Sequence, residues 1–98
     1  MDYFIENGID RDTVDFVYGE LSEDKIFSLE YNRKNVVDIY NYLKSIGITE
    51  NSIKELLISN TDLFIIDLSN IKDKLDKCKN TDIIELINSN VDLINQII

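Results

Sequence analysis

Hydrophobic residues recur three and four positions apart along most of the chain, and no long stretch alternates between hydrophobic and polar residues. Spacings of three and four place side chains on one face of an α-helix, whereas alternation is the pattern of a β-strand. The pattern therefore predicts an all-α protein, a single small domain of about six to seven short helices.

Capping residues and glycines divide this pattern into separate helices, because they satisfy or interrupt the hydrogen bonding at helix ends. The expected N-caps are Asp10, Ser22, Asn32, Thr49, Ser69 and Thr81. The expected ends are Gly19, Glu30, Ser45 before Gly47, Asn60 and, for the helix from Asp82, Asn88. Residues 91–98 should add a last turn or two, and they leave open whether Ile94, Ile97 and Ile98 close the core or pair with another chain.

The inward faces of these helices should form the core. They carry Val14, Val17, Ile26, Leu29, Val36, Val37, Tyr40, Leu43, Ile53, Leu56, Leu57, Ile71, Leu75 and Cys78. The short hydrophobic segment 63–66 also fits a strand, because β-branched and aromatic residues favour strands. We rank the strand second, since no partner strand is evident and an isolated strand is unstable.

The chain resembles itself at an offset of 30 residues. Residues 54–63 and 84–93 are identical at six of ten positions, and both contain Ser-Asn, one further residue and Asp-Leu. A weaker third copy pairs Gly8-Ile9-Asp10 with Gly47-Ile48-Thr49. Short helices with a period near 30 are typical of stacked α-helical repeats. We therefore expect one domain over 1–98, with N-terminal helices in 1–42 and two repeats in 43–98.

The second half of the chain also resembles a known family. The residues that carry the resemblance are Leu43, Gly47, Ile48, Thr49, Ile53, Leu56, Leu57, Leu63, Phe64 and Ser69. Their pattern over residues 43–98 is similar to the helical repeats of the mitochondrial transcription termination factor family. The resemblance implies a stacked helical-repeat fold. The nucleic-acid groove of that family is basic and this chain is acidic, so the resemblance implies little about function.

The formal net charge of −9 is concentrated at the N-terminal end. Residues 1–30 have a net charge of −7 and residues 31–98 a net charge of −2. The candidate partner-binding residues are Asp10, Asp12, Asp15, Glu20, Glu23, Asp24 and Glu30, with Tyr3, Phe4, Phe16 and Tyr18 interleaved among the charges. Such a surface either keeps the chain in solution or binds a basic partner.

Missing residue types exclude most catalytic chemistry. The chain has no His, so it lacks the commonest general base and zinc ligand, and its three glycines are too dispersed to form a phosphate-binding loop. We expect Cys78 to be a small buried hydrophobic residue rather than a reactive thiol. We therefore expect no enzyme activity, no cofactor and no metal, and, without a leader or membrane segment, a cytoplasmic location.

These observations favour a non-enzymatic protein-binding module. The abundance of Ile, Asn, Asp and Lys is typical of an AT-rich bacterial or phage gene, and in size and charge the chain is similar to small acidic phage inhibitors of the anti-CRISPR or DNA-mimic class. The expected partner is a protein with a basic surface, such as a CRISPR effector or another nucleic-acid enzyme. The alternative is a regulatory nucleic-acid-binding helical-repeat protein that uses Arg33, Lys34, Lys44, Lys54 and the face 72–79. The oligomeric state is left open.

Overall fold

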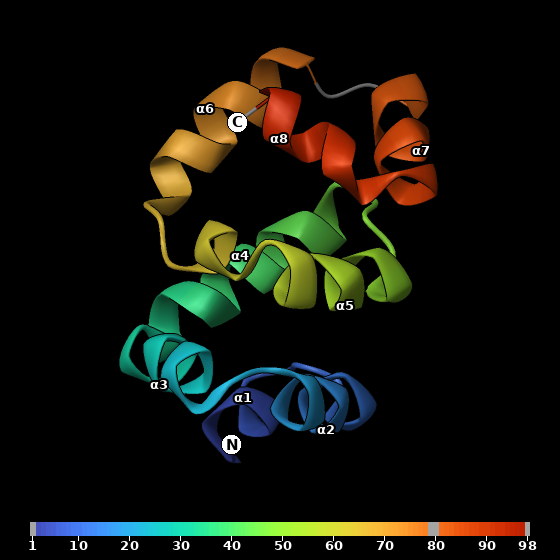
Figure 1. The fold of residues 1–98 in the computed structure, drawn as a ribbon. Helices are drawn as coiled ribbons and strands as arrows, with labels where there is room; N and C mark the ends of the chain where they lie inside the picture. Colours follow the sequence, from blue (N-terminus) through green and yellow to red (C-terminus); the bar gives the residue numbers. More distant parts are fainter. Residues whose placement is uncertain (1, 79–80, 98) are drawn as a thin grey trace.

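A computed structural model describes residues 2–78 and 81–97, apart from the side chains of Asp2, Cys78 and Thr81 (Figure 1). Its α-helices are α1 (Asp2–Glu6), α2 (Arg11–Glu20), α3 (Glu23–Tyr31), α4 (Arg33–Ser45), α5 (Glu50–Ser59), α6 (Leu68–Cys78), α7 (Thr81–Ser89) and α8 (Ile94–Ile97). Two short 3₁₀-helices, η1 (Thr61–Phe64) and η2 (Val91–Leu93), complete the fold. No strand occurs in these ranges, so the all-α prediction is confirmed.

The helices form three units that stack one on another from the blue to the red end of the chain in Figure 1. We call α1–α3 the N-terminal unit, α4, α5 and η1 the central unit, and α6, α7, η2 and α8 the C-terminal unit. The N-terminal unit packs on the central one through α2 against α5 and α3 against α4. The C-terminal unit packs on the opposite side, through α6 against α4 and α7 against α5.

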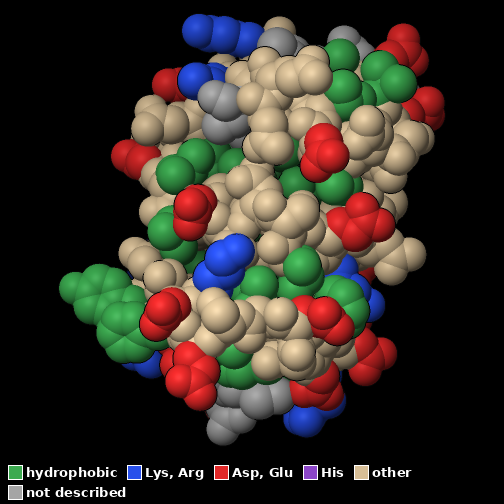
Figure 2. All heavy atoms as spheres, in the orientation of Figure 1, with side chains coloured by type: hydrophobic (Ala, Val, Ile, Leu, Met, Phe, Trp, Pro, Cys, Tyr) green, Lys and Arg blue, Asp and Glu red, His purple; other side chains and the backbone are tan. Residues whose placement is uncertain are grey.

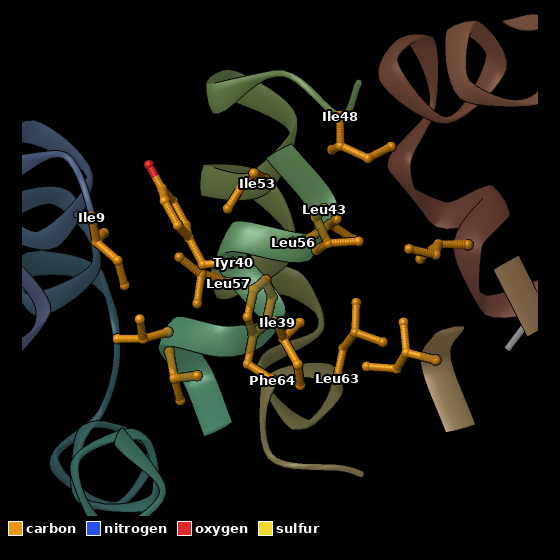
Figure 3. Packing of buried hydrophobic residues seen from close by; sticks show 14 of the residues in the cluster. Ile9, Ile39, Tyr40, Leu43, Ile48, Ile53, Leu56, Leu57, Leu63 and Phe64 are labelled. Carbon is orange, nitrogen blue, oxygen red and sulfur yellow. The ribbon is translucent and has the colours of Figure 1, made fainter. Parts of the chain in front are cut away.

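The core runs through all three units and is densest in the central one. Tyr40 and Leu57 lie toward the N-terminal unit, whereas Leu43, Leu56 and Leu63 lie toward the C-terminal unit (Figure 3). This arrangement follows from the helical period, because adjacent residues such as Leu56 and Leu57 point about 100° apart. The central unit therefore presents a hydrophobic side to each neighbour.

Local signals in the sequence predict several helix ends correctly. Helix α4 spans Arg33–Ser45 as expected, and the caps of α3 and α5 form, since Ser22 and Thr49 accept from the backbone N–H groups of Lys25 and Ser52. Ile94 is fully buried and closes the core, while Ile97 is partly buried. Ile98, for which the same question was left open, lies outside the described residues.

Other helix ends differ from the prediction. Gly19 lies inside α2, which continues to Glu20, because its backbone is not left-handed and so does not end the helix. Helix α6 begins at Leu68, and the residue that caps it is Asp67, whose Oδ1 accepts from the N–H of Ser69 at 3.0 Å. Asn32 precedes α4 without a side-chain cap, because its Nδ2 donates backward to the carbonyl oxygen of Ser28.

Three further predictions concern the segment 63–66 and the side chains of Thr81 and Cys78. The strand alternative for residues 63–66 is wrong, since this stretch contains the end of η1. Helix α1 was not expected at all. The side chains of Thr81 and Cys78 are outside the described part, so the expected cap and the expected burial of the thiol stay predictions.

The internal repeat appears in the backbone as well as in the sequence. Helix α5 ends with the N–H of Asn60 donating to the carbonyl of Leu56 at 2.8 Å, and α7 ends with the same bond from Asn90 to Leu86 at 2.9 Å. A 3₁₀-helix follows each of them, η1 after Asn60 and η2 after Asn90. The two copies therefore fold alike, and the Ser-Asn-x-Asp-Leu pattern marks the junction between helix and 3₁₀-helix.

The weaker third copy also has a structural counterpart. Gly8 and Gly47 both have a φ of +105°, a left-handed conformation that favours glycine. Each is followed by a buried isoleucine whose N–H donates at 3.0 Å to a carbonyl five residues earlier, Ile9 to Phe4 and Ile48 to Leu43. The same turn therefore joins α1 to α2 and α4 to α5. The expected boundary between residues 42 and 43 lies inside α4.

Two polar clusters join the units. Glu50 of α5 accepts hydrogen bonds from Thr13 of the N-terminal unit and from Tyr40 and Lys44 of α4. On the other side, Asn88 of α7 lies against the turn that precedes α5. No helix in the described ranges is long and apolar enough to cross a lipid bilayer.

Candidate functional site

The candidate carboxylates of α2 lie on its outward face. Packing on α5 buries Thr13, Val14 and Val17, which fixes the rotation of the helix. Asp12 and Asp15, three residues apart, therefore share the side that faces solvent, and both are exposed. Asp10 before the helix and Glu20 at its end are also exposed, and the carboxylate of Asp10 makes no capping hydrogen bond.

Helix α3 continues this acidic surface. Ser22 caps the helix, so Glu23 and Asp24 fall in its first turn, where carboxylates interact favourably with the helix dipole. Leu29 is buried against the core, which turns Glu23 and Asp24 outward, and both are exposed. The acidic residues of both helices are thus available to a partner.

An exposed pair of aromatic rings lies beside these carboxylates. Phe27 and Tyr31 are one helical turn apart on α3, and their rings stack with centroids 6.1 Å apart and planes at 27°. Their exposed fractions are 67% and 80%. Figure 2 shows hydrophobic side chains projecting at the left edge, at the level of α3, with acidic side chains beside them. Contiguous exposed hydrophobic patches often mark interaction sites, and aromatic residues are enriched in protein interfaces.

A hydrogen bond ties α2 to α3 within the surface. The hydroxyl of Tyr18 donates to Oε1 of Glu30 at 2.6 Å. Burial of the ring and this bond to a carboxylate raise the pKa of Tyr18 above its ordinary value, so the phenol stays protonated. Glu30 is therefore both an exposed carboxylate and a structural link between the two helices.

The other candidate carboxylates are not neutralised within the part of the chain that the structure describes. These six residues are Asp10, Asp12, Asp15, Glu20, Glu23 and Asp24. In the described part of the chain, their side chains take part in no hydrogen bond or ion pair. The ion pairs recorded lie elsewhere, between Lys34 and Asp38 and between Lys44 and Glu50. The negative charge of these six residues therefore faces solvent.

The structure changes which aromatic residues belong to this surface. Of the four expected, Phe4 is buried in the core, and Tyr3 and Tyr18 are partly buried. Phe16 is 43% exposed, with the ammonium of Lys54 5.7 Å from its ring centroid. Phe27 and Tyr31 were missed, although their spacing of four, on the side of α3 opposite Leu29, was a usable signal.

We call the exposed side chains of α2 and α3 the acidic-aromatic surface. It comprises Asp10, Asp12, Asp15, Glu20, Glu23, Asp24, Phe27, Glu30 and Tyr31. In the described residues no three Asp, Glu, Cys or His side chains are close enough to hold a metal ion. The chemistry that this surface offers is therefore charge pairing and ring stacking with a partner.

Five basic residues of the alternative function have contacts inside the molecule. Lys34 and Lys44 are in ion pairs, and Lys54 lies over Phe16. The guanidinium of Arg33 lies 4.7 Å from the ring centroid of Tyr3, and Lys72 lies over Tyr42 at 5.6 Å. Lys79 is outside the described residues. The five cations lie on α4, α5 and α6.

Comparison of the chain with protein families, with curated proteins and with solved structures finds no match. The resemblance of residues 43–98 to the mitochondrial transcription termination factor repeats therefore stays a prediction.

Proposed function

We propose that this chain is a non-enzymatic binding protein whose acidic-aromatic surface contacts a protein with a basic, nucleic-acid-binding surface. The observation that carries the proposal is the stacked pair of Phe27 and Tyr31, exposed on the same helix as Glu23 and Asp24, whose carboxylates take part in no ion pair within the described ranges. Aromatic residues contribute most of the binding energy in many interfaces, and single-sign charge accelerates association.

The chemistry of the surface selects the kind of partner. Carboxylates at helical spacings present rows of negative charge, as a nucleic-acid backbone does, and so fit clustered Lys and Arg. Arginine guanidinium groups also stack on aromatic faces. We therefore propose a nucleic-acid enzyme such as a CRISPR effector as the target class, with the chain acting as an inhibitor of phage or mobile-element origin that competes with nucleic acid.

The test is competition with nucleic acid. A fluorescent duplex is bound to a purified effector nuclease, and increasing amounts of the chain are added. We expect displacement of the duplex, with an association rate that falls steeply as salt screens the charges. A chain that displaces no duplex from any tested effector at low salt would remove this target class.

Matched variants locate the surface. In the first, Asp12, Asp15, Glu20, Glu23 and Asp24 are changed to Lys. In the control, five exposed acidic residues of the other two units, Glu55, Asp62, Asp73, Asp82 and Asp92, are changed to Lys. Both variants have the same net charge, so only the first should lose displacement if the proposal is right. Equal loss in both would mean that overall charge, and not this surface, is responsible.

The aromatic pair is tested separately. Phe27→Ala and Tyr31→Ala remove exposed rings and leave the core intact, so each should fold. We expect each substitution to weaken binding about 10-fold or more, which is the typical effect of removing one anchor residue from an interface. The same chain without an enzyme should produce no shift of DNA or RNA at low salt; a shift would favour the nucleic-acid-binding alternative.

A further inference from the structure

The turn between α1 and α2 contains the dipeptide Asn7-Gly8, and Asn7 is the one asparagine of the chain that precedes a glycine. Both residues are exposed, and they directly follow α1, the first helix of the stack (Figure 1). The side-chain amide of an asparagine can react with the backbone nitrogen of the next residue. Gly8 has no side chain to obstruct that nitrogen, so this pair is chemically reactive.

The reaction is intramolecular and consumes only water. The backbone nitrogen of Gly8 loses its proton and attacks Cγ of Asn7, which forms a new carbon–nitrogen bond. The side-chain nitrogen takes up that proton and leaves as ammonia, so a succinimide ring closes. Water then opens the ring. Attack of water at Cγ gives aspartate, whereas attack at the backbone carbonyl carbon gives isoaspartate, in which the chain continues through Cγ.

Two hydrogen bonds restrain the reacting groups in the folded chain. Nδ2 of Asn7 donates to the carbonyl oxygen of Tyr3 at 2.8 Å, and the N–H of Gly8 donates to the carbonyl oxygen of Ile5 at 3.2 Å. Both bonds must break before the nitrogen of Gly8 can attack Cγ. Both acceptors belong to α1, so the reaction requires the end of α1 to open.

This opening involves a small part of the structure. Helix α1 is five residues long, and so short a helix has little stability of its own. Phe4, which is 4% exposed, anchors it in the core, and Arg33 lies over the ring of Tyr3. A segment with so few buried contacts opens at a lower free energy than the core does.

The two asparagines that precede a serine are held more firmly. Asn51 precedes Ser52 inside α5, where the N–H of Ser52 donates to Oγ1 of Thr49 at 3.2 Å. Asn88 precedes Ser89 at the end of α7, and two hydrogen bonds tie its side-chain amide to the turn before α5. These asparagines are therefore internal references for the reactivity of Asn7.

We propose that Asn7-Gly8 is a site of spontaneous succinimide formation, reached when the end of α1 opens, and that its products release α1 from the rest of the N-terminal unit. Either product abolishes the hydrogen bond from Nδ2 to Tyr3 and changes the net charge of residues 1–30 from −7 to −8. The proposal is independent of the proposed function, because it rests on the chemistry of the turn alone.

The isoaspartate product should have the larger effect on the fold. It adds one carbon atom to the backbone of the turn, which displaces the N–H of Ile9 from the carbonyl oxygen of Phe4. Phe4 and Ile9 are both buried and line the same core cavity. Losing the bond between them therefore separates α1 from the core.

The first test is incubation of the whole chain at mildly alkaline pH, followed by peptide mapping with mass spectrometry. We expect a gain of about 1 Da, the difference between NH₂ and OH, in the peptide that contains Asn7, with both aspartate and isoaspartate formed. Peptides that contain Asn51 and Asn88 should stay unchanged. Asn7→Gln is the matched variant, because it keeps an amide at this position but closes the larger ring slowly, and it should show no gain.

The same chain unfolded in guanidinium chloride gives the reference rate without the turn. We expect Asn7 to react in the native chain more slowly than in this reference. If Asn7 stays intact in the native chain after the unfolded chain has reacted completely, the proposal is overturned. A product that contains aspartate alone also overturns it, because that product would come from direct hydrolysis.

The second test asks whether the packing of α1 controls the rate. Phe4→Leu shortens the side chain that anchors α1 and should speed the reaction at Asn7 about fivefold or more. Phe64→Leu is the matched control, because it removes the same atoms from the buried core of the central unit. It should leave the rate at Asn7 nearly unchanged. An equal effect of the two variants, or no effect of Phe4→Leu, overturns the dependence on α1.

The third test follows the consequence for the fold. In the isoaspartate fraction, the backbone N–H of Ile9 should exchange with solvent faster than in the unmodified chain, while the amides of α4 and α5 keep their protection. Unchanged exchange at Ile9 would overturn the release of α1.

Discussion

Thr13 of α2 donates its hydroxyl to Oε2 of Glu50, at the start of α5, over 2.5 Å. The other oxygen of the same carboxylate accepts from the hydroxyl of Tyr40 at 2.5 Å and from the ammonium of Lys44 at 2.9 Å. Burial alone would raise the pKa of Glu50, but these three donors outweigh it and hold that pKa below its usual value. One charged group thus holds the N-terminal unit to the central unit.

Replacing this carboxylate should destabilise the fold. Glu50→Gln keeps the shape but removes the charge to which the three donors bind, and we expect a loss of about 1–3 kcal/mol in the free energy of unfolding. Urea denaturation measures it. The control is Asp38→Asn, which removes the exposed ion pair with Lys34 and should cost no more than about 0.5 kcal/mol. Equal losses would contradict the role assigned to Glu50.

The same residue predicts a pH dependence. Because the pKa of Glu50 is lower in the folded chain than its ordinary value of 4.5, the unfolded chain binds the proton first as the pH falls. Its contribution is present above 4.5 and is lost as the pH drops through the folded pKa. Urea denaturation at about pH 7 and about pH 3 should show the gap between wild type and Glu50→Gln shrinking. A constant gap would contradict this linkage.

Glycine substitutions should have opposite signs at two positions. Gly47 has a φ of +105°, and a Cβ there would lie 3.2 Å from Cγ2 of Ile84, so Gly47→Ala should destabilise by about 1–2 kcal/mol. Gly19 lies in a helix, and a Cβ there would meet nothing within 4 Å. Gly19→Ala should therefore stabilise by about 0.5–1 kcal/mol. Thermal denaturation of both variants checks the two signs.

A third glycine separates strain from crowding. Gly8 has the same φ as Gly47, but the nearest atom to a Cβ would be Oδ1 of Asn41 at 3.9 Å. Gly8→Ala should therefore be destabilising through backbone strain alone, and by less than Gly47→Ala. A larger loss at Gly8 than at Gly47 would mean that contact with Ile84 adds nothing.

Asn88 should matter more than a surface asparagine usually does. Its side-chain amide accepts from the N–H of Thr49 at 2.9 Å and donates to the carbonyl of Gly47 at 3.1 Å, so it stabilises the turn between α4 and α5. Asn88→Ala should cost about 1–2 kcal/mol by urea denaturation. Asn51→Ala, at an exposed position of α5, should change stability by no more than about 0.5 kcal/mol.

The sequence predicts correctly those helix ends and caps that depend on residues close together in the chain. The ends of α4 and the cap at Thr49 depend on residues within one helical turn, and both were predicted. Asp67 and Ser69, two positions apart, are both good N-cap residues. The pattern predicted Ser69, whereas Asp67 caps α6. Helix α1 was missed because it is only five residues long, and contacts with α4, 30 residues away, hold it in place.

The same distinction between local and long-range contacts applies to the candidate site. That Asp12 and Asp15 would be exposed follows from the helical period once Val14 and Val17 are inward. The spacing of four brings Phe27 and Tyr31 together on α3, whereas their exposure depends on how α3 is rotated against α4, which the sequence pattern of so short a helix defines poorly. The cluster around Glu50 brings together side chains from positions 13, 40, 44 and 50, and no local pattern joins them.

The stacking of three units also sets the order in which the native chain opens. The N-terminal and C-terminal units each pack mainly on the central unit, so either can detach while the other two stay together. Amide hydrogens of α4 and α5 should consequently exchange with solvent only through global unfolding, and those of α1–α3 and α6–α8 through smaller openings. The free energy of local opening is then highest in the central unit and decreases toward both ends of the stack.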